Sequence, residues 1–337
     1  SLLARQTTIV GVLAIGMMFV IVAGHIDLSV GSVLGFCGTV AAVLQVWYEW
    51  DTFPTIVVTI LIGMACGVWH GYWVAYRKVP AFIITLGGLL AFRGAKLGLG
   101  NSMSIAPMNS SFSALGQSYL PATAGWIIAA IAVAGVFVSA FQRRSSAIKY
   151  QAYVAPLMID VTRAAGISFA IVFGIGYLNR YQGIPMPVLI MLVLAVVFTF
   201  VANKTVFGRD VYAIGGNIDA SALSGIQTRL TTMVVFILSS GMAAIAGMIL
   251  TARLDAATPA AGDTMELDAI AACVIGGTSM AGGVGRVPSV IIGALVMASL
   301  DNGMSLINLE NYWQFIVKGL VLTLAVWADT MSKNLSE

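Results

Sequence analysis

Hydrophobic residues along this chain gather in long unbroken runs that are separated by short polar stretches. A helix that crosses the bilayer core needs about 20 predominantly apolar residues. Ten runs fit this requirement, near residues 7–23, 31–47, 54–76, 81–97, 123–141, 161–178, 186–203, 229–252, 288–304 and 312–328. The runs do not alternate apolar and polar positions, which excludes a membrane β-barrel. The pattern therefore predicts an all-α polytopic membrane protein with about ten transmembrane helices, in a single domain over 1–337.

Composition supports lipid as the solvent of this chain. Apolar residues make up 59% of the 337 positions and charged residues only 9%, against about 25% charged residues in ordinary soluble domains. The net charge of +3 is small and scattered, which argues against a nucleic-acid partner. Cys37, Cys66 and Cys273 each lie in an apolar run without metal-ligand or disulfide spacing, so we expect no metal site and no disulfide.

The first interruption of the helical pattern is a polar, Gly-flanked step over 23–31 that contains His25 and Asp27. An acid at membrane depth costs a few kcal/mol, so it usually faces protein, water or a helix end. We expect Asp27 to cap a half-helix that begins at Leu28, because its carboxylate can accept the free backbone N–H groups there. Direct contact with a transported substrate is the alternative that stays open.

The second interruption is a short apolar segment from Glu266 that runs into a Gly-rich break over 276–283. Broken or re-entrant helices are tolerated at membrane depth only where protein or a water-filled cavity surrounds them. Asp268 and Thr278 in this segment therefore join His25 and Asp27 as candidate residues of a translocation path.

Two tryptophans one helical turn apart, Trp69 and Trp73, complete the candidate path. Aromatic rings commonly line sites for small ligands, although anchoring at the lipid interface is the more common role of Trp in membrane proteins. In the same run Gly63, Gly67 and Gly71 form a small-xxx-small ladder, which predicts close helix packing.

A third segment, about 204–228, reads as a soluble connection between two runs. Asn217 and Asp219 can cap a short helix over 219–224 that Gly225 ends. A short exposed helix of this kind suits the docking of a partner, and an ordinary connecting loop is the open alternative. The expected docking residues are Asn217, Asp219, Ala220, Ala222, Leu223, Ser224 and Gly225.

The distribution of basic residues predicts the orientation of the chain, because Lys and Arg concentrate in cytoplasmic loops. Eleven of the 17 lie in alternate connections: Arg77, Lys78, Arg143, Arg144, Lys149, Arg163, Lys204, Arg209, Arg229, Arg286 and Lys333. These connections and the C-terminus are therefore expected in the cytoplasm. Counting back places Ser1 outside, so we expect one further crossing upstream of it. Arg93, Lys96 and Lys318 lie inside or at the ends of runs, without an assigned role.

Several stretches resemble the permease subunits of ribose/xylose-type ABC sugar importers, and above all those that import D-xylose. They lie at 24–31 (GHIDLSVG), 73–92, 117–121 (QSYLP), 207–226, 253–285 (with ELDAIAACVIGGTSMAGG) and 300–329. The resemblance implies an ABC importer permease fold, a homodimer in the bacterial inner membrane, a cytoplasmic ATPase that binds ATP and Mg, and a periplasmic sugar-binding protein. The N-terminal helix of the family is absent here, and 142–163 lacks the family pattern.

Motifs for other functions are missing from the sequence. It contains no G-x-x-x-x-G-K-[ST] loop to hold ATP phosphates, and its two histidines, His25 and His70, form no H-E-x-x-H pattern. We therefore expect no enzyme activity, no catalytic residue and no cofactor on this chain. The alternative class is a free-standing ion-coupled secondary carrier or channel, in which Asp27 and Asp268 would serve the coupling ion.

Overall fold

The computed structural model describes residues 2–150 and 156–334, most of which are helical. By its contacts the chain divides into a smaller unit, Ser118–Met186, and a larger unit formed by Leu2–Gln117 and Pro187–Glu337. The prediction of one permease domain over the whole chain stays a prediction.

The larger unit contains most of the helices. They are α1 (Leu2–Val22), α2 (Val30–Ala42) with a π-helical extension η1 (Val43–Trp47), α3 (Thr52–Ala75), α4 (Ala81–Leu99), α5 (Ser110–Gln117), α8 (Met186–Lys204, of which Met186 belongs to the smaller unit), α9 (Val206–Gly216), α10 (Ile218–Leu223), α11 (Thr228–Leu254), α12 (Met265–Ile275), α13 (Val287–Leu306) and α14 (Asn311–Asn334).

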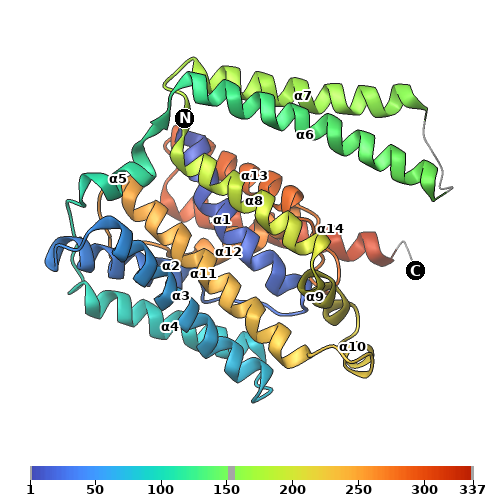
Figure 1. Cartoon of the computed structure of the whole chain (residues 1–337). Coiled ribbons are helices and arrows are strands. Elements are labelled where there is room, and N and C mark those ends of the chain that lie inside the picture. Colours follow the sequence, from blue (N-terminus) through green and yellow to red (C-terminus); the bar gives the residue numbers. More distant parts are fainter. Residues whose placement is uncertain (1, 151–155, 335–337) are drawn as a thin grey trace. The chain divides into compact units, whose positions relative to one another are not determined.

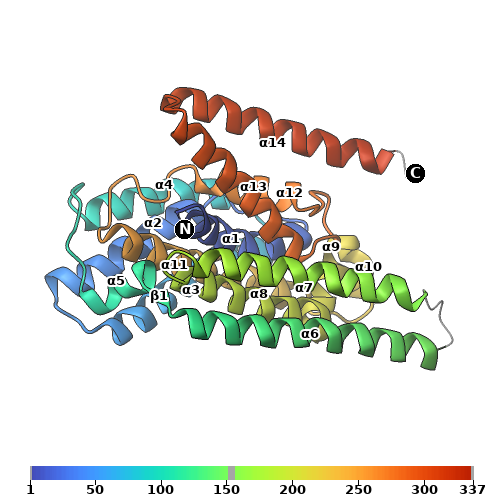
Figure 2. The same ribbon diagram turned by 90° about the horizontal axis from the view of Figure 1, so that it is seen from above.

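The core of the larger unit surrounds α1. Figure 1 shows α1 in the middle of this unit, between α11 and α13, and it also packs against α12. Its side chains are buried from Thr7 to Val22, as expected for a helix that is apolar on every side. Figure 2 shows α14 extending from the turn after α13 along one side of the unit.

Small residues allow α3 and α11 to approach closely. A Cβ added at Gly67 would lie 2.5 Å from the carbonyl oxygen of Phe236, and one added at Gly71 would lie 2.9 Å from the Cα of Met233. Both neighbours are backbone atoms of α11, so the two helices would have to separate to admit a side chain. The predicted role of the glycine ladder in helix packing is confirmed.

The smaller unit is a helical hairpin of α6 (Ala122–Lys149) and α7 (Leu157–Asn179), which lie side by side and antiparallel (Figures 1 and 2). At one end the short strands β1 (Tyr119–Leu120) and β2 (Ile184–Pro185) pair antiparallel. Near the other end Arg144 Nη1 lies 2.9 Å from Asp160 Oδ2. An ion pair and a strand pair thus join the two arms.

Across the described residues, ten helices are long and apolar enough to cross a membrane, and each coincides with one of the ten predicted runs. The predicted fold class is therefore confirmed: the chain is an all-α polytopic membrane protein. The second predicted interruption also appears, as the short helix α12 followed by an irregular segment over 276–286.

Candidate translocation path and docking segment

Asp27 lies fully buried in the connection between α1 and α2. Its Oδ1 accepts hydrogen bonds from the backbone N–H of Ser29 at 2.9 Å and from the Ser29 hydroxyl at 2.5 Å, while its Oδ2 accepts one from the Ser239 hydroxyl of α11 at 3.4 Å. The prediction that Asp27 caps a helix from Leu28 is wrong, because α2 begins at Val30 and the carboxylate closes a turn just before it.

His25 borders a cavity of about 630 Å³, while its ring packs against Phe236 with centroids 5.9 Å apart. The cavity is also lined by Lys78 from the α3–α4 turn, by Asp219 and Ala222 of α10, and by Arg229 of α11, among others. Its size is in the range of small-molecule sites. The structure thus brings one candidate path residue together with two candidate docking residues at one opening.

Asp268 is engaged in ion pairing within the protein. Its Oδ2 lies 3.0 Å from Lys318 Nζ of α14, and the same Nζ lies 3.0 Å from Oδ2 of Asp301 in α13. The sequence signal for this pairing is Lys318 itself, because a basic residue inside an apolar run requires an acidic partner; the sequence does not show which acid that is.

Thr278 follows α12 and is fully buried, with its backbone N–H donating to the carbonyl of Cys273 at 2.9 Å. Its hydroxyl is buried without a hydrogen-bond partner among the described residues. Gly277 has φ +80°, a conformation that glycine adopts at little cost, and it ends the helix at the predicted place. A role of Thr278 in transport stays a prediction.

Trp69 and Trp73 contact each other edge to face on α3, with ring centroids 5.6 Å apart. The Trp69 side chain is 56% exposed, whereas Trp73 is half-buried. Exposure on the surface of a membrane helix fits the interfacial role, and stacking on a sugar remains the untested alternative.

Arg93 and Lys96, which had no assigned role, form ion pairs and a hydrogen bond with the segment just before α12, at Ala261 and Asp263. Both are on α4 and both contact Asp263, with Arg93 Nη2 at 2.8 Å and Lys96 Nζ at 3.1 Å. Lys96 is buried and also donates to the carbonyl of Ala261 at 2.8 Å. The three basic residues that the sequence left without a role, Arg93, Lys96 and Lys318, are thus paired with acids.

The expected docking segment contains two helices where the sequence predicted one. The first part of the segment, which the sequence predicted as loop, forms α9. Thr205 caps the first turn of α9, because its hydroxyl oxygen accepts a hydrogen bond from the N–H of Gly208 at 3.1 Å. Asn217 Oδ1 accepts from the N–H of Ala220 at 2.9 Å and caps α10 as predicted. The prediction that Asp219 also caps this helix is wrong, because α10 begins at Ile218 and places Asp219 in its first turn.

The end of α10 presents an apolar side chain to the surroundings. Leu223 is 91% exposed, and Ala222 beside it is exposed too. Ser224 closes the helix through its hydroxyl, which donates to the carbonyl of Ala220 at 2.8 Å, and Gly225 turns the chain with φ +86°. A groove of about 450 Å³ follows, lined by the start of α9, the turn after α10 and the start of α11.

Hydrogen bonds and close packing connect the expected docking segment, about 204–228, with the break that follows α12, 276–286. The hydroxyl of Tyr212 on α9 donates to the carbonyl of Gly285 at 2.7 Å. A phenol hydroxyl is protonated at neutral pH and can donate, and burial raises the pKa of Tyr212 further in the same direction. The N–H of Gly283 donates to the carbonyl of Val22 at 2.9 Å, and Gly215 packs against both of these residues.

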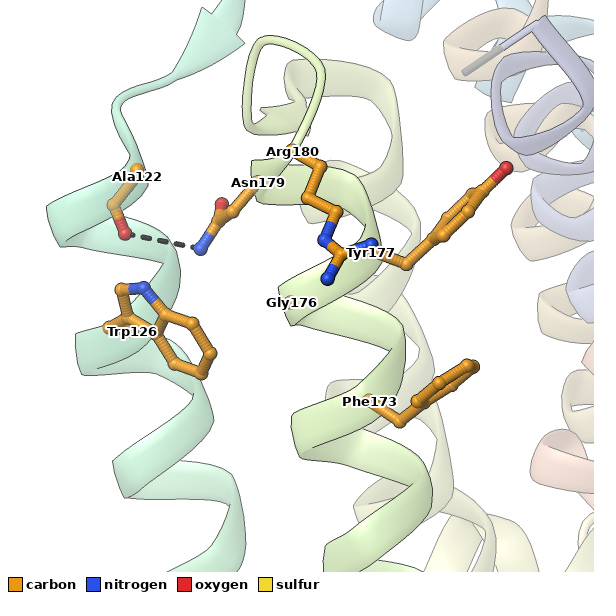
Figure 3. Close-up of a pocket in the computed structure, with 7 residues that line it drawn as sticks. All are labelled: Ala122, Trp126, Phe173, Gly176, Tyr177, Asn179 and Arg180. Atoms are coloured by element: carbon orange, nitrogen blue, oxygen red, sulfur yellow. Dashed lines mark hydrogen bonds between the residues drawn. The ribbon is translucent and has the colours of Figure 1, made fainter.

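A separate pocket of about 520 Å³ opens within the hairpin of the smaller unit (Figure 3). Its lining includes Trp126 on α6 and Phe173 and Tyr177 on α7, and Figure 3 shows the last two rings extending from α7 on the side away from α6, with Arg180 just past the end of α7. Asn179 crosses between the two helices, and its Nδ2 donates to the carbonyl of Ala122 at 3.3 Å. This mixture of aromatic and polar side chains is typical of helix ends at a membrane interface.

In the part of the chain that the structure describes, ten membrane-length helices and the short helix α12 with its glycine-rich end make a polytopic membrane protein. A family model described as the branched-chain amino acid transport system / permease component matches residues 1–326. The chain belongs to this permease family. This confirms the predicted class, the permease component of a transport system, over a free-standing carrier.

Named relatives match nearly the whole chain. It is 51% identical to the xylose transport system permease protein XylH of Haemophilus influenzae, with 99% of this chain and 89% of the relative covered. For XylH of Escherichia coli strain K12 the identity is 49%, over 100% and 86% of the two chains. The ribose import permease protein RbsC of the same strain is 35% identical, over 96% and 83%. No solved structure matches the chain.

Proposed function

We propose that this chain is the membrane-spanning permease subunit of an ATP-driven ABC importer that carries D-xylose across a bacterial inner membrane. One observation supports the choice of sugar. Over almost the same length the chain is 51% and 49% identical to two xylose permeases but only 35% identical to a ribose permease.

The proposal includes three partners: a cytoplasmic ATPase, a periplasmic sugar-binding protein and a second copy of this chain. ATP and Mg belong to the ATPase, so this chain carries the sugar pathway and performs no hydrolysis. The exposed Leu223 at the end of α10 supports the segment over 204–228 as the ATPase contact, because a projecting apolar side chain suits insertion into a groove of a partner.

The proposed path places the sugar near His25, Asp27, Trp69, Trp73, Asp268 and Thr278. The cavity beside His25 and α10 supports an opening next to the ATPase contact. There, hydroxyl groups of a sugar would find Lys78, Asp219 and Arg229 as hydrogen-bonding partners.

Transport by the reconstituted complex tests the proposal. The permease, its ATPase and its binding protein are placed in proteoliposomes, and uptake of radiolabelled D-xylose is measured with ATP and with a non-hydrolysable analogue. We expect uptake only with ATP, no effect of an uncoupler, and little competition from D-ribose. Uptake that follows an ion gradient without ATP would contradict the mechanism, and preferred uptake of ribose would contradict the substrate.

A further inference from the structure

Three charged side chains from three helices meet at one point in the larger unit. Lys318 of α14 lies 3.0 Å from Asp268 of α12 and 3.0 Å from Asp301 of α13. The side chains of Lys318, Asp268 and Asp301 are 16%, 5% and 26% exposed. We call these three residues the ion triad.

Lys318 and Asp301 lie inside helices that are long enough to cross the membrane, and Asp268 lies in the short helix α12. Lys318 stands about two turns into α14, and Asp301 about one and a half turns before the end of α13, which corresponds to depths of about 10 and 8 Å along the helices. Charges at such places are retained when they pair with one another. Loss of one partner leaves the others uncompensated.

Lys318 is the centre of this arrangement. Both carboxylates contact the same ammonium, and Oδ1 of Asp268 and of Asp301 is buried without a hydrogen-bond partner among the described residues. Removal of the ammonium therefore leaves two negative charges without a counter-ion at once. Asp268 would suffer most, because its side chain is the most buried of the three.

The helix held by the ion triad is α12, which packs against α1, α2, α13 and α14. Asp268 is in the first turn of α12. The opposite end of α12 leads into the break where Tyr212 of α9 donates to Gly285 and where Gly283 donates to Val22. The re-entrant helix thus connects the ion triad with the docking segment.

We propose that Lys318 is a positioning residue for transport. It keeps α12 packed against α1, a position that we call the seat of α12, so that a movement of α9 and α10 shifts α12 as one rigid helix. The transport part of this inference rests on the proposed function, whereas the seat of α12 does not. The role of Lys318 follows from the contacts of the triad and not from contact with sugar.

Cys273 provides a native reporter for the seat of α12. It is fully buried, and its Sγ donates to the carbonyl of Ala14 on α1 at 3.3 Å. With Cys37→Ala and Cys66→Ala, Cys273 becomes the only thiol of the chain. Its rate of reaction with a membrane-permeant maleimide then measures how far α12 separates from α1, without any need for ATPase or sugar.

The labelling experiment compares three variants in this background. We expect Lys318→Met to raise the initial rate at Cys273 by roughly tenfold or more, because two uncompensated carboxylates push α12 out of its seat. Lys318→Arg keeps the cation and should retain slow labelling. The double variant Lys318→Met with Asp268→Asn removes both charges of the Lys318–Asp268 pair. The labelling rate of Cys273 in this double variant should therefore return to within about threefold of the parent rate.

A matched control separates this effect from general loosening of the protein. Arg144→Met breaks the ion pair with Asp160 in the α6–α7 hairpin, whose two atoms are 2.9 Å apart, and should leave Cys273 labelling unchanged. In the full complex at matched membrane levels, Lys318→Met should lower the maximal rate of D-xylose uptake by roughly tenfold. Lys318→Arg should restore that rate, with the half-saturating concentration of loaded binding protein unchanged.

Two results would overturn the positioning role. One is Cys273 labelling in Lys318→Met at the parent rate, and the other is fast labelling that the double variant does not reverse. A different result would separate the two proposals: labelling as expected, with no D-xylose uptake even by the wild type, would support the seat of α12 and contradict the proposed function.

Discussion

At the scale of single residues, hydrogen bonds decide how the docking segment is connected to the membrane core. Tyr212 reaches from α9 to the carbonyl of Gly285, and Gly283 donates to the last residue of α1, Val22. These bonds join the segment proposed to contact an ATPase with the break after α12. A small change in one of them should therefore weaken transport without unfolding the protein.

Tyr212→Phe tests this connection, because it removes the hydroxyl and keeps the ring. A hydrogen bond contributes about 1 kcal/mol on balance, so we expect the rate of ATP-dependent uptake to fall by roughly fivefold. Tyr76→Phe is the control, since Tyr76 is an exposed ring at the end of α3. Equal uptake by Tyr212→Phe and wild type, at the same amount in the membrane, would show that this bond does not transmit movement.

At the scale of elements, the pair α9 and α10 is the most distinctive part of the chain. Thr205 and Asn217 cap the two helices in succession, and Gly225 ends the second. Capping fixes each helix by its own side chains, so a short helix can keep its shape while it projects Leu223 outward. A projecting, self-supported helix is what a docking contact requires.

Leu223→Asp tests the contact. A charge buried without a partner in an interface costs several kcal/mol, so we expect co-purification of the ATPase to fall by roughly tenfold or more, and uptake with it. The permease should stay folded and in the membrane, because the Leu223 side chain is exposed in the chain itself. Met103→Asp, at another strongly exposed apolar residue in the loop after α4, is the control. Equal recovery of the ATPase by the Leu223 variant would exclude this docking site.

At the scale of the whole molecule, the alternating connections predict which end of each helix faces the cytoplasm. A cysteine placed at Arg143, in the background without Cys37, Cys66 and Cys273, should react with an impermeant maleimide only in inside-out vesicles. A cysteine at Asp51 should react in intact cells, because the basic connections are expected inside. Labelling in the reverse pattern would overturn the orientation and, with it, the side proposed for the ATPase.

The ten membrane helices, the break after α12 and the cap at Asn217 can all be predicted from the amino-acid sequence. Each of these depends on neighbouring residues: the length of an apolar run, a glycine that ends a helix, a side chain that reaches its own backbone. Such local signals need no knowledge of distant segments.

The pairing of buried charges, in contrast, depends on how the helices pack. Asp268 pairs with Lys318, which lies 50 residues later, and Asp27 accepts from Ser239, which lies 212 residues later. The apolar runs that carry these residues could pack in many orders, since lipid favours none of them over another. The partners therefore depend on close packing at small residues and on the pairing of buried charges, both of which exist only after the helices have assembled.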